Sequence, residues 1–397
     1  MRTLNTLLML LAAASTNAQA TWELMEPAPA PGRFWAAATG NSTHGYAGTG
    51  RLQFSGVNNE VADMYAYEVS TGQWTQIPDY PGGVRAGMDA FTIGERIFFC
   101  FGSPFIQFSR ELYEYLPTTE TWVAHELVPG IGFGYSHGFV IDDTYYIGPE
   151  NGTNQVYAFS ATTESWTSVA PFPGNDRRAQ CAFSANGKGY IGMGAGVFSG
   201  VYGDWWEYDP IADSWTEIAS VFPNADQASA TAIGNVGYLY NTGGGSGGGQ
   251  QLYLYDATNN TWNADALLPG DRIANAAMFT SGDHGYLVFG DRSTSGGNFS
   301  SNALWRITPG ATSVPEIGPF DLRIVAMRGS ISIRSERMLD ASGTVQLHDA
   351  RGALIAASTL RAGALNVDIG TALVPGLYVV QVRAGDKFES TRVLLAP

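Results

Sequence analysis

Six tryptophans recur through the first 262 residues of this chain at nearly constant spacing. The intervals are 52, 48, 44, 49 and 47 residues, between Trp22, Trp74, Trp122, Trp166, Trp215 and Trp262. A sustained period of this length is typical of repeat architectures, in which each repeat is one supersecondary unit. One unit cannot bury both of its faces alone, so successive repeats must stack against each other. The sequence therefore predicts a set of similar, mutually packed units.

Each repeat contains four strand-forming segments in the same order. In the fourth repeat these are a small-residue segment (Ala179–Phe183), a segment ending in glycine (Gly189–Gly192), an aromatic segment (Trp205–Tyr208) and the strand that carries Trp215. Alternating aromatic and polar residues with a period of two favour strands. The pair Asp209-Pro210 between the last two segments favours a tight turn. Each repeat is therefore predicted to be a four-stranded antiparallel sheet.

These features together resemble the Kelch repeat over roughly residues 21–308. The glycine pair that follows the second strand in that family survives at Gly243-Gly244, and is spaced as Gly-x-Gly at Gly48/Gly50 and Gly192/Gly194. The resemblance implies an all-β fold, a Kelch-type β-propeller whose blades stack around an axis. Small residues then belong on the innermost strands, and the Trp and Tyr columns fill the gaps between neighbouring sheets.

The ends of the repeat region predict how the ring closes. The last repeat reaches an aromatic strand in which Trp305 holds the Tyr column, and no Trp-bearing strand follows it. The unmatched Trp strand is Thr21–Leu24, at the other end. We therefore expect a six-bladed propeller over residues 21–310 in which the N-terminal strand completes the sixth blade.

Residues 1–20 have the layout of a secretory signal peptide. Arg2 supplies a positive charge, Leu7–Ala14 form an apolar run, and Ala18-Gln19-Ala20 offers a small-x-small cleavage site. The apolar run is too short to span a bilayer, and no later segment is long enough, so no transmembrane segment is expected. The mature chain is predicted to begin near Thr21 and to be secreted or held at the cell surface.

A second domain is predicted after the repeats. Residues 311–322 contain Pro315 and Gly318-Pro319 and indicate a linker. Residues 323–397 lack the Trp and Tyr columns and predict a small antiparallel β-sandwich. The strings at 347–352, 373–382 and 391–395 resemble the type IX secretion C-terminal sorting domain of Bacteroidetes-like bacteria, although its usual Tyr-Pro-Asn-Pro opening is absent.

This second resemblance implies a bacterial host and a partner in the secretion machinery, since such a domain is an address and not an anchor. An ordinary immunoglobulin-like accessory module remains the alternative.

The charge distribution argues against two classes of partner. The whole chain has a formal net charge of −15, and residues 21–316 carry 11 Lys and Arg against 29 Asp and Glu. An acidic surface repels the phosphates of nucleic acid and of anionic membranes.

The two cysteines, Cys100 and Cys181, fall on blades that are not neighbours, so we expect buried free thiols and not a disulfide.

No motif in the sequence carries recognisable chemistry. Kelch-type folds include copper oxidases resembling galactose oxidase, but no histidine of the repeat region directly follows a tyrosine, as that family's motif requires. These histidines are His44, His125, His137 and His284. Zinc spacing, a phosphate loop and a nucleophile elbow are not evident. The sequence therefore predicts no catalytic residues, no metal site and no cofactor.

Arginines offer the one candidate binding set. Arg33, Arg85 and Arg177 each lie six residues before one position of the inner strand, and Arg272 lies in the similar loop of the sixth repeat. In other Kelch propellers, arginines at this position line the ligand-binding face. The resemblance therefore implies a site for an acidic or glycan ligand. The alternative is that each arginine bridges loops or balances an acidic residue.

The leading functional hypothesis is an exported, non-catalytic binding or surface-interaction protein whose partner is an unknown protein or glycan. The alternative is a carbohydrate-active propeller enzyme resembling the sialic acid mutarotases, with copper oxidation disfavoured. Fold alone does not decide between them.

Overall fold

The computed structural model describes residues 19–395 except for the short segments 55–56, 104–107, 150–151, 197–199, 222–223, 226–227, 243–248, 295–296, 311–321, 328–329, 340–341, 350–352, 362, 370–372, 375 and 385–386. The predicted signal peptide therefore lies almost wholly outside the described residues, as does most of the predicted linker. Residues 19–311 form one compact unit, and Thr312–Pro397 belong to a second. No helix in the described part of the chain is long and apolar enough to cross a membrane.

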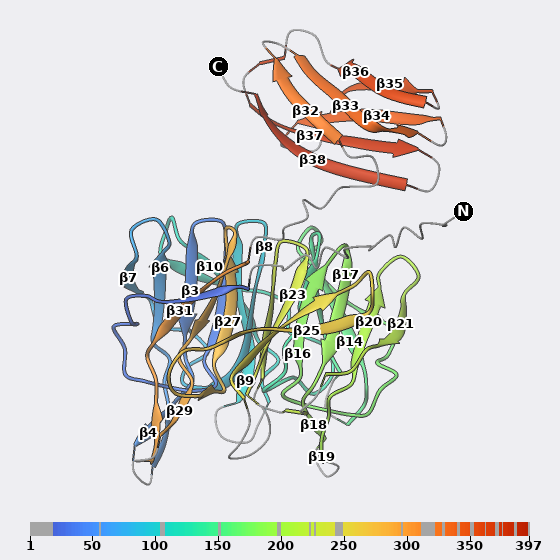
Figure 1. Cartoon of the computed structure of the whole chain (residues 1–397). Coiled ribbons are helices and arrows are strands. Elements are labelled where there is room, and N and C mark those ends of the chain that lie inside the picture. Colours follow the sequence, from blue (N-terminus) through green and yellow to red (C-terminus); the bar gives the residue numbers. More distant parts are fainter. Residues whose placement is uncertain are drawn as a thin grey trace, which may run out of the picture. The chain divides into compact units, whose positions relative to one another are not determined.

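The described residues of the larger unit form six four-stranded antiparallel sheets, and their arrangement can be followed in Figure 1. The strands of the first three sheets are β2 Ala37–Gly40, β3 His44–Gly48, β6 Met64–Glu68 and β7 Gln73–Ile77; β8 Ala86–Ile93, β9 Arg96–Ser103, β10 Leu112–Leu116 and β11 Thr121–Ala124; and β12 Phe139–Ile141, β13 Thr144–Ile147, β14 Val156–Ser160 and β15 Ser165–Val169. Those of the last three are β16 Cys181–Ala185, β17 Lys188–Gly192, β20 Trp205–Asp209 and β21 Ser214–Ile218; β22 Ser229–Ile233, β23 Val236–Asn241, β24 Gln251–Asp256 and β25 Thr261–Leu267; and β27 Ala277–Ser281, β28 His284–Val288, β31 Leu304–Thr308 and β1 Thr21–Leu24.

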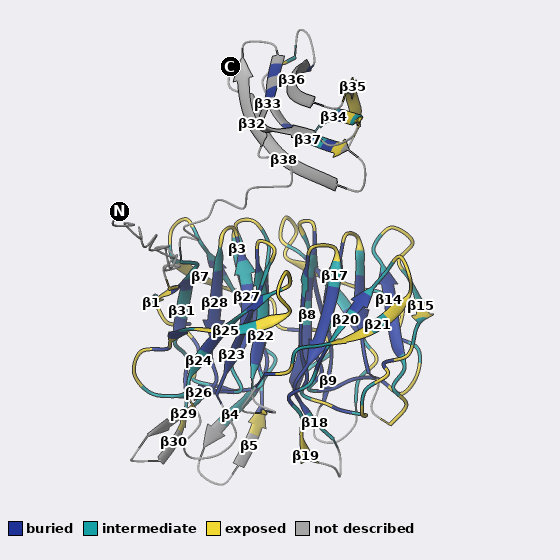
Figure 2. Cartoon of the chain, turned by 45° about the vertical axis from the view of Figure 1, so that its right-hand side comes forward, coloured by how far each residue is buried: buried dark blue, intermediate teal, exposed yellow. Residues whose placement is uncertain are grey.

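The sixth sheet joins the two ends of this unit. Strand β1 pairs antiparallel with β31, and Trp22 lies opposite Ile307. The first strands of successive sheets also contact each other in order, from β2 through β8, β12, β16, β22 and β27, and β27 contacts β2 again. The first and second strands of the sheets are mostly buried, whereas the fourth strands and many of the turns that join the strands are largely exposed (Figure 2).

The tryptophan column links each sheet to the one before it. In five sheets the indole Nε1–H donates to a backbone carbonyl that lies four residues after the preceding tryptophan of the series, at 2.9–3.1 Å. The pairs are Trp74 to Glu26, Trp122 to Pro78, Trp166 to Glu126, Trp215 to Ala170 and Trp262 to Ala219. The repeat period is therefore the distance along the chain between two equivalent inter-sheet contacts.

The glycines of the Gly-Tyr pairs near the start of the second strands also allow neighbouring sheets to pack closely. A Cβ added to Gly189 would lie 1.9 Å from the ring of Phe139, and one added to Gly237 would lie 2.2 Å from the ring of Phe183. In both cases the ring comes from the first strand of the preceding sheet. Glycine is needed there because the neighbouring sheet places an aromatic ring against the backbone.

Three sheets carry an additional element between their second and third strands that the sequence does not predict. These elements are β4 Arg51–Phe54 with β5 Val57–Glu60, β18 Ala195–Gly196 with β19 Gly200–Val201, and β29 Asp291–Thr294 with β30 Gly297–Ser300, the last of which also pairs with β26 Ile273–Ala274. Strands β4, β18 and β29 lie at the same end of the sheets (Figure 1).

The smaller unit consists of two antiparallel sheets with one shared core. One sheet contains β32 Leu322–Met327, β33 Ser330–Leu339 and β36 Gly363–Ile369; the other contains β35 Leu354–Leu360, β34 Gly343–Asp349, β37 Gly376–Ala384 and β38 Lys387–Leu395. Ile331 and Ile333 of the first sheet pack with Val345, Leu347 and Val380 of the second. Strand β32 begins within the predicted linker and was not predicted from the sequence.

Both cysteines are free and buried, as expected from their positions in the repeat. Burial raises the pKa of Cys100 well above its usual value and that of Cys181 to about 12, so both stay protonated at neutral pH. We expect neither thiol of the folded protein to react with a thiol reagent at pH 8, and both to react after unfolding without reductant. Rapid labelling of the folded protein would contradict this burial, and a single reactive thiol after unfolding would show that the other is blocked.

Candidate functional site

Three of the four candidate arginines lie in loops before the first strands of their sheets and have buried side chains. The side chains of Arg33 and Arg177 are fully buried, and that of Arg85 is nearly so. Arg33 donates to both carboxylate oxygens of Asp63 at 2.7 and 2.8 Å, and Arg177 binds Asp204 in the same way at 2.8 and 2.6 Å. These guanidinium groups are therefore occupied by partners within the protein.

Arg85, the third buried arginine, makes an equivalent ion pair, but with a glutamate in place of an aspartate. Arg85 donates to Glu111 Oε2 at 2.8 Å and to the carbonyl of Phe101 at 3.1 Å. Arg33 and Arg177 also reach the carbonyls 16 residues further on, at 3.1 and 3.2 Å. Each arginine thus ties the loop before the first strand to the end of the second strand and the start of the third.

Pairing with arginine lowers the pKa values of the Asp63 and Asp204 carboxylates. Burial alone would raise the pKa of Asp63 and of Asp204, but the hydrogen bonds and positive charge of the paired arginine outweigh burial, so both pKa values are lowered. A buried charged group is stable only when it is paired in this way.

In the three remaining sheets, both the arginine and its acidic partner are replaced by other residues. The arginine position holds Phe133, Ala225 and Ile273 in the third, fifth and sixth sheets. The acid position, at or just before the start of the third strand, holds Gln155, Gln251 and Ala303. Arg272 lies one residue before this column, in the corresponding loop of the sixth sheet. Loss of the acid wherever the arginine is lost supports the structural alternative. A ligand-binding role for Arg33, Arg85, Arg177 and Arg272 stays a prediction.

The first strands of all six sheets surround one cavity of about 250 Å³. Its walls are mostly Ala, Gly, Ser and Thr, because bulkier side chains on all six converging strands would fill the space. Several hydroxyl groups in the wall bond to neighbouring strands: Thr280 Oγ1 donates to the carbonyl of Ala232 at 2.6 Å, and Ser229 Oγ donates to that of Ala276 at 2.5 Å.

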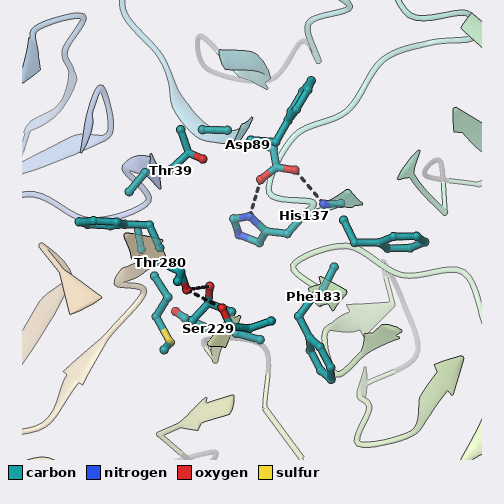
Figure 3. Close-up of a pocket in the computed structure, with 18 of the residues that line it drawn as sticks. Thr39, Asp89, His137, Phe183, Ser229 and Thr280 are labelled. Atoms are coloured by element: carbon teal, nitrogen blue, oxygen red, sulfur yellow. Dashed lines mark hydrogen bonds and ion pairs between the residues drawn. The ribbon is translucent and has the colours of Figure 1, made fainter. Parts of the chain in front are cut away.

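One aspartate–histidine pair interrupts this lining of small and apolar side chains. His137 Nδ1 lies 3.0 Å from Asp89 Oδ1, and both residues line the cavity. The Asp89 carboxylate is almost fully buried, whereas 43% of the His137 side chain is exposed. Figure 3 shows the imidazole ring beside Asp89 and directed toward the open centre, across from Ser229 and Thr280. The pair therefore presents the second imidazole nitrogen to anything that enters the cavity.

Asp89 is held by donors on three sides. In addition to His137, its Oδ2 accepts hydrogen bonds from the backbone N–H of Gly138 at 2.7 Å and from the Tyr145 hydroxyl at 2.6 Å. Tyr145 stacks on Phe91 with ring centroids 3.7 Å apart. Burial, together with the Asp89 charge, raises the pKa of Tyr145 well above its usual value, so its hydroxyl stays protonated and donates.

This geometry has a clear chemical consequence. A carboxylate with three donors accepts the Nδ1–H of His137, which leaves a lone pair on Nε2. An imidazole oriented by a buried carboxylate is a common arrangement for a general acid–base group. This pair was not predicted from the sequence, in which His137 belongs to no recognisable motif.

Comparisons with known proteins give partial matches. The chain is 29% identical over 113 residues to the N-acetylneuraminate epimerase of Pasteurella multocida, a match covering 27% of this chain and 30% of that protein. It is 28% identical over 195 residues to the N-acetylneuraminate epimerase of Escherichia coli K12, covering 46% of this chain and 52% of that protein. The chain thus spans about half or less of the length of the curated relatives it matches. No family model matches the chain.

The solved structure of YjhT resembles this chain with a TM-score of 0.58 at 14% identity, over 70% of this chain and 95% of that one. At this identity the likeness shows the fold alone, a β-propeller. The names of the curated relatives, and not this structural likeness, favour the carbohydrate-enzyme alternative over the non-catalytic binding protein that was preferred from the sequence.

Proposed function

We propose that this protein is a propeller enzyme that interconverts the anomers of a reducing sugar, with His137 as the acid–base group. The observation that carries the proposal is the Asp89–His137 pair in the central cavity, with one imidazole nitrogen bonded to the carboxylate and the ring half exposed. The names of the relatives favour N-acetylneuraminate or a closely similar sugar as substrate.

The chemistry needs two proton transfers and the reversible opening of the sugar ring. Nε2 of His137 takes the proton of the anomeric hydroxyl, and the electron pair of that O–H bond forms the carbonyl as the ring C–O bond breaks. The imidazolium, stabilised by Asp89, returns the proton to the ring oxygen. Rotation of the open chain and the reverse steps give the other anomer. General acid–base catalysis of this kind typically contributes roughly 10²–10⁴-fold in rate.

We also propose that the six sheets are the blades of a closed Kelch-type propeller. Support comes from the antiparallel pairing of β1 with β31, from the contact between β27 and β2, and from tryptophan contacts that repeat from sheet to sheet. The four-strand order and its residue types support the Kelch assignment, which rests on the sequence resemblance.

Export to the surface or exterior of a bacterial cell is a further proposal, supported by the N-terminal pattern and by the strings of the C-terminal unit. One observation bears on the cleavage site. Ala20, the last residue of the predicted signal peptide, is buried, and its N–H lies 3.0 and 3.2 Å from the two Asp265 carboxylate oxygens. Sequencing the mature N-terminus would show whether processing removes Ala20, as predicted, or retains it.

The functional proposal is tested by following the approach to anomeric equilibrium of freshly dissolved N-acetylneuraminate by ¹H NMR. We expect the purified protein to accelerate it well beyond the spontaneous rate in proportion to enzyme concentration. Glucose, a reducing sugar without a carboxylate, serves as the comparison substrate. Binding of the sugar with no acceleration would reject the enzyme and favour the non-catalytic binding protein.

A further inference from the structure

The junction between the fifth and sixth sheets differs from the five others in its hydrogen bonds. Trp22, the tryptophan of the sixth sheet, packs edge to face on Tyr240, but among the described residues its buried Nε1 has no hydrogen-bond partner. Two residues near the N-terminus bind the fifth sheet instead. The Ala20 N–H donates to both carboxylate oxygens of Asp265 at 3.0 and 3.2 Å, and Gln19 Nε2 donates to the Asp265 carbonyl at 3.1 Å. These bonds replace the tryptophan contact at this junction.

Asp265 is an acidic residue at a position where the other sheets have none. It follows the tryptophan of its own sheet by three residues. The residues at the same distance after the other five tryptophans are Met25, Ile77, His125, Val169 and Ile218. The acid therefore occurs only in the sheet that contacts Gln19 and Ala20.

Two other junctions contain a related contact in which donor and acceptor are exchanged. Asp213 Oδ1 accepts the N–H of Ala170, which follows the third sheet, and Asn260 Oδ1 accepts the N–H of Ala219, which follows the fourth, both at 2.8 Å. Each acceptor lies two residues before the tryptophan of its sheet. Ala20 holds that position in the sixth sheet and has no side-chain acceptor. It provides the donor there, and the acid lies on the facing strand.

The contact is also part of the core. Ala20 is 4% exposed and belongs to the apolar cluster that contains Tyr240 of the fifth sheet and Ile307 of the sixth. Burial raises the pKa of the half-buried Asp265, and the hydrogen bond from the Ala20 N–H opposes that rise. A positive charge near Asp265 would further favour its ionised form.

We propose that the signal peptide is cut between Ala18 and Gln19, and that Gln19 and Ala20 of the mature chain form a terminal clamp on Asp265. The triplet Thr16-Asn17-Ala18 fits the small-x-small pattern, as Ala18-Gln19-Ala20 does. Hydrolysis of this bond by water leaves a carboxylate on the leader and an α-ammonium group on Gln19, one residue from the donor to Asp265.

A cut after Ala20 would remove both residues of the terminal clamp and leave Asp265 half-buried without their hydrogen bonds. Loss of such bonds from a partly buried carboxylate costs free energy. The inference rests on the proposed export and specifies the bond that processing cleaves. It is independent of mutarotation.

The cleaved bond can be identified from the intact mass of the protein. The full chain is expressed with its own leader in a Gram-negative bacterium and purified from cells and medium. We expect a chain that begins at Gln19, with or without the loss of ammonia that accompanies cyclisation of an N-terminal glutamine. A chain that begins at Thr21 would overturn the inference and leave the proposed export standing. A chain that retains residues 1–18 would reject both.

The terminal clamp is tested by chemical denaturation of two chains, 19–397 and 21–397, each released from a fusion without added residues. We expect the shorter chain to unfold at a lower denaturant concentration. Asp265→Ala should lower the midpoint of chain 19–397 but not that of chain 21–397, because the shorter chain has already lost the clamp. Asp213→Ala is the matched control, since it removes the related contact between the third and fourth sheets, and it should lower both midpoints equally. Equal midpoints for the two unsubstituted chains would show that no clamp exists, whichever bond is cleaved.

Discussion

Replacing His137 with glutamine is expected to lower the catalysed rate of mutarotation at least about 100-fold, because general acid–base groups contribute roughly 10²–10⁴-fold. Glutamine has a similar length and keeps an amide donor for the Asp89 carboxylate, but it cannot exchange a proton near neutral pH. With 43% of its side chain exposed, His137 is also a residue whose replacement should leave the core intact. The rate is measured by ¹H NMR at equal protein concentration.

Two further variants separate chemistry from structure. His44→Gln is the matched control, since His44 is the first residue of β3, bonds to the Thr43 hydroxyl and does not line the cavity. It should retain full activity. Asp89→Asn removes the charge that orients His137, and we expect it to lower the rate and to alter its pH dependence. A His137→Gln variant with unchanged kcat would rule out this histidine as the acid–base group, wherever else catalysis occurs.

The repeat made most of the propeller predictable from sequence. Trp74 and Trp122 each make the same contact with the preceding sheet. Because this contact is repeated from sheet to sheet, tryptophan recurs in the sequence at a regular spacing. The unmatched strand at Thr21–Leu24 likewise indicated its partner, and β1 pairs with β31. The added hairpins, such as β4 with β5, contribute no repeated contact, so periodicity carries no information about them.

The candidate site is harder to predict from the sequence than the fold. Asp89 is the single charged residue within the six first strands, all of which the structure describes, and a charge in such a strand requires a partner. His137 follows it by 48 residues, about one repeat, which places the two residues on neighbouring sheets. Their proximity could therefore have been predicted from the repeat. Their shared cavity could not, because it depends on how six small-residue strands converge.

The arginine column shows a different limit of prediction from sequence. Sequence spacing aligned Arg33 with Arg177 correctly, but it did not distinguish a buried guanidinium from one that faces solvent. The deciding residues, Asp63 and Asp204, lie about 30 positions further along the chain at the start of the third strand. Comparing the two columns across all six repeats, and not the arginine column alone, would have favoured the structural role.

Removing the N-terminal strand is expected to destabilise the larger unit by at least about 3 kcal/mol. A chain that begins at residue 27 loses β1 and with it Trp22, which packs edge to face on Tyr240 of the fifth sheet. It also loses the buried Ala20, whose N–H is bound by Asp265. Deletion of one large core aromatic alone typically costs 3–5 kcal/mol. Chemical denaturation, compared with a chain that begins at residue 19, measures the loss.

The same deletion should also change the state of association. Strand β31 would become an unpaired edge, and exposed edges pair readily with other chains, so light scattering should detect dimers or larger species. Removing residues 312–397 instead is the control, because that segment belongs to the other compact unit and the sixth sheet stays complete. If the chain beginning at residue 27 unfolds at the same denaturant concentration as the longer chain, β1 does not close the ring. The six sheets must then be held together by the contact between β27 and β2 alone.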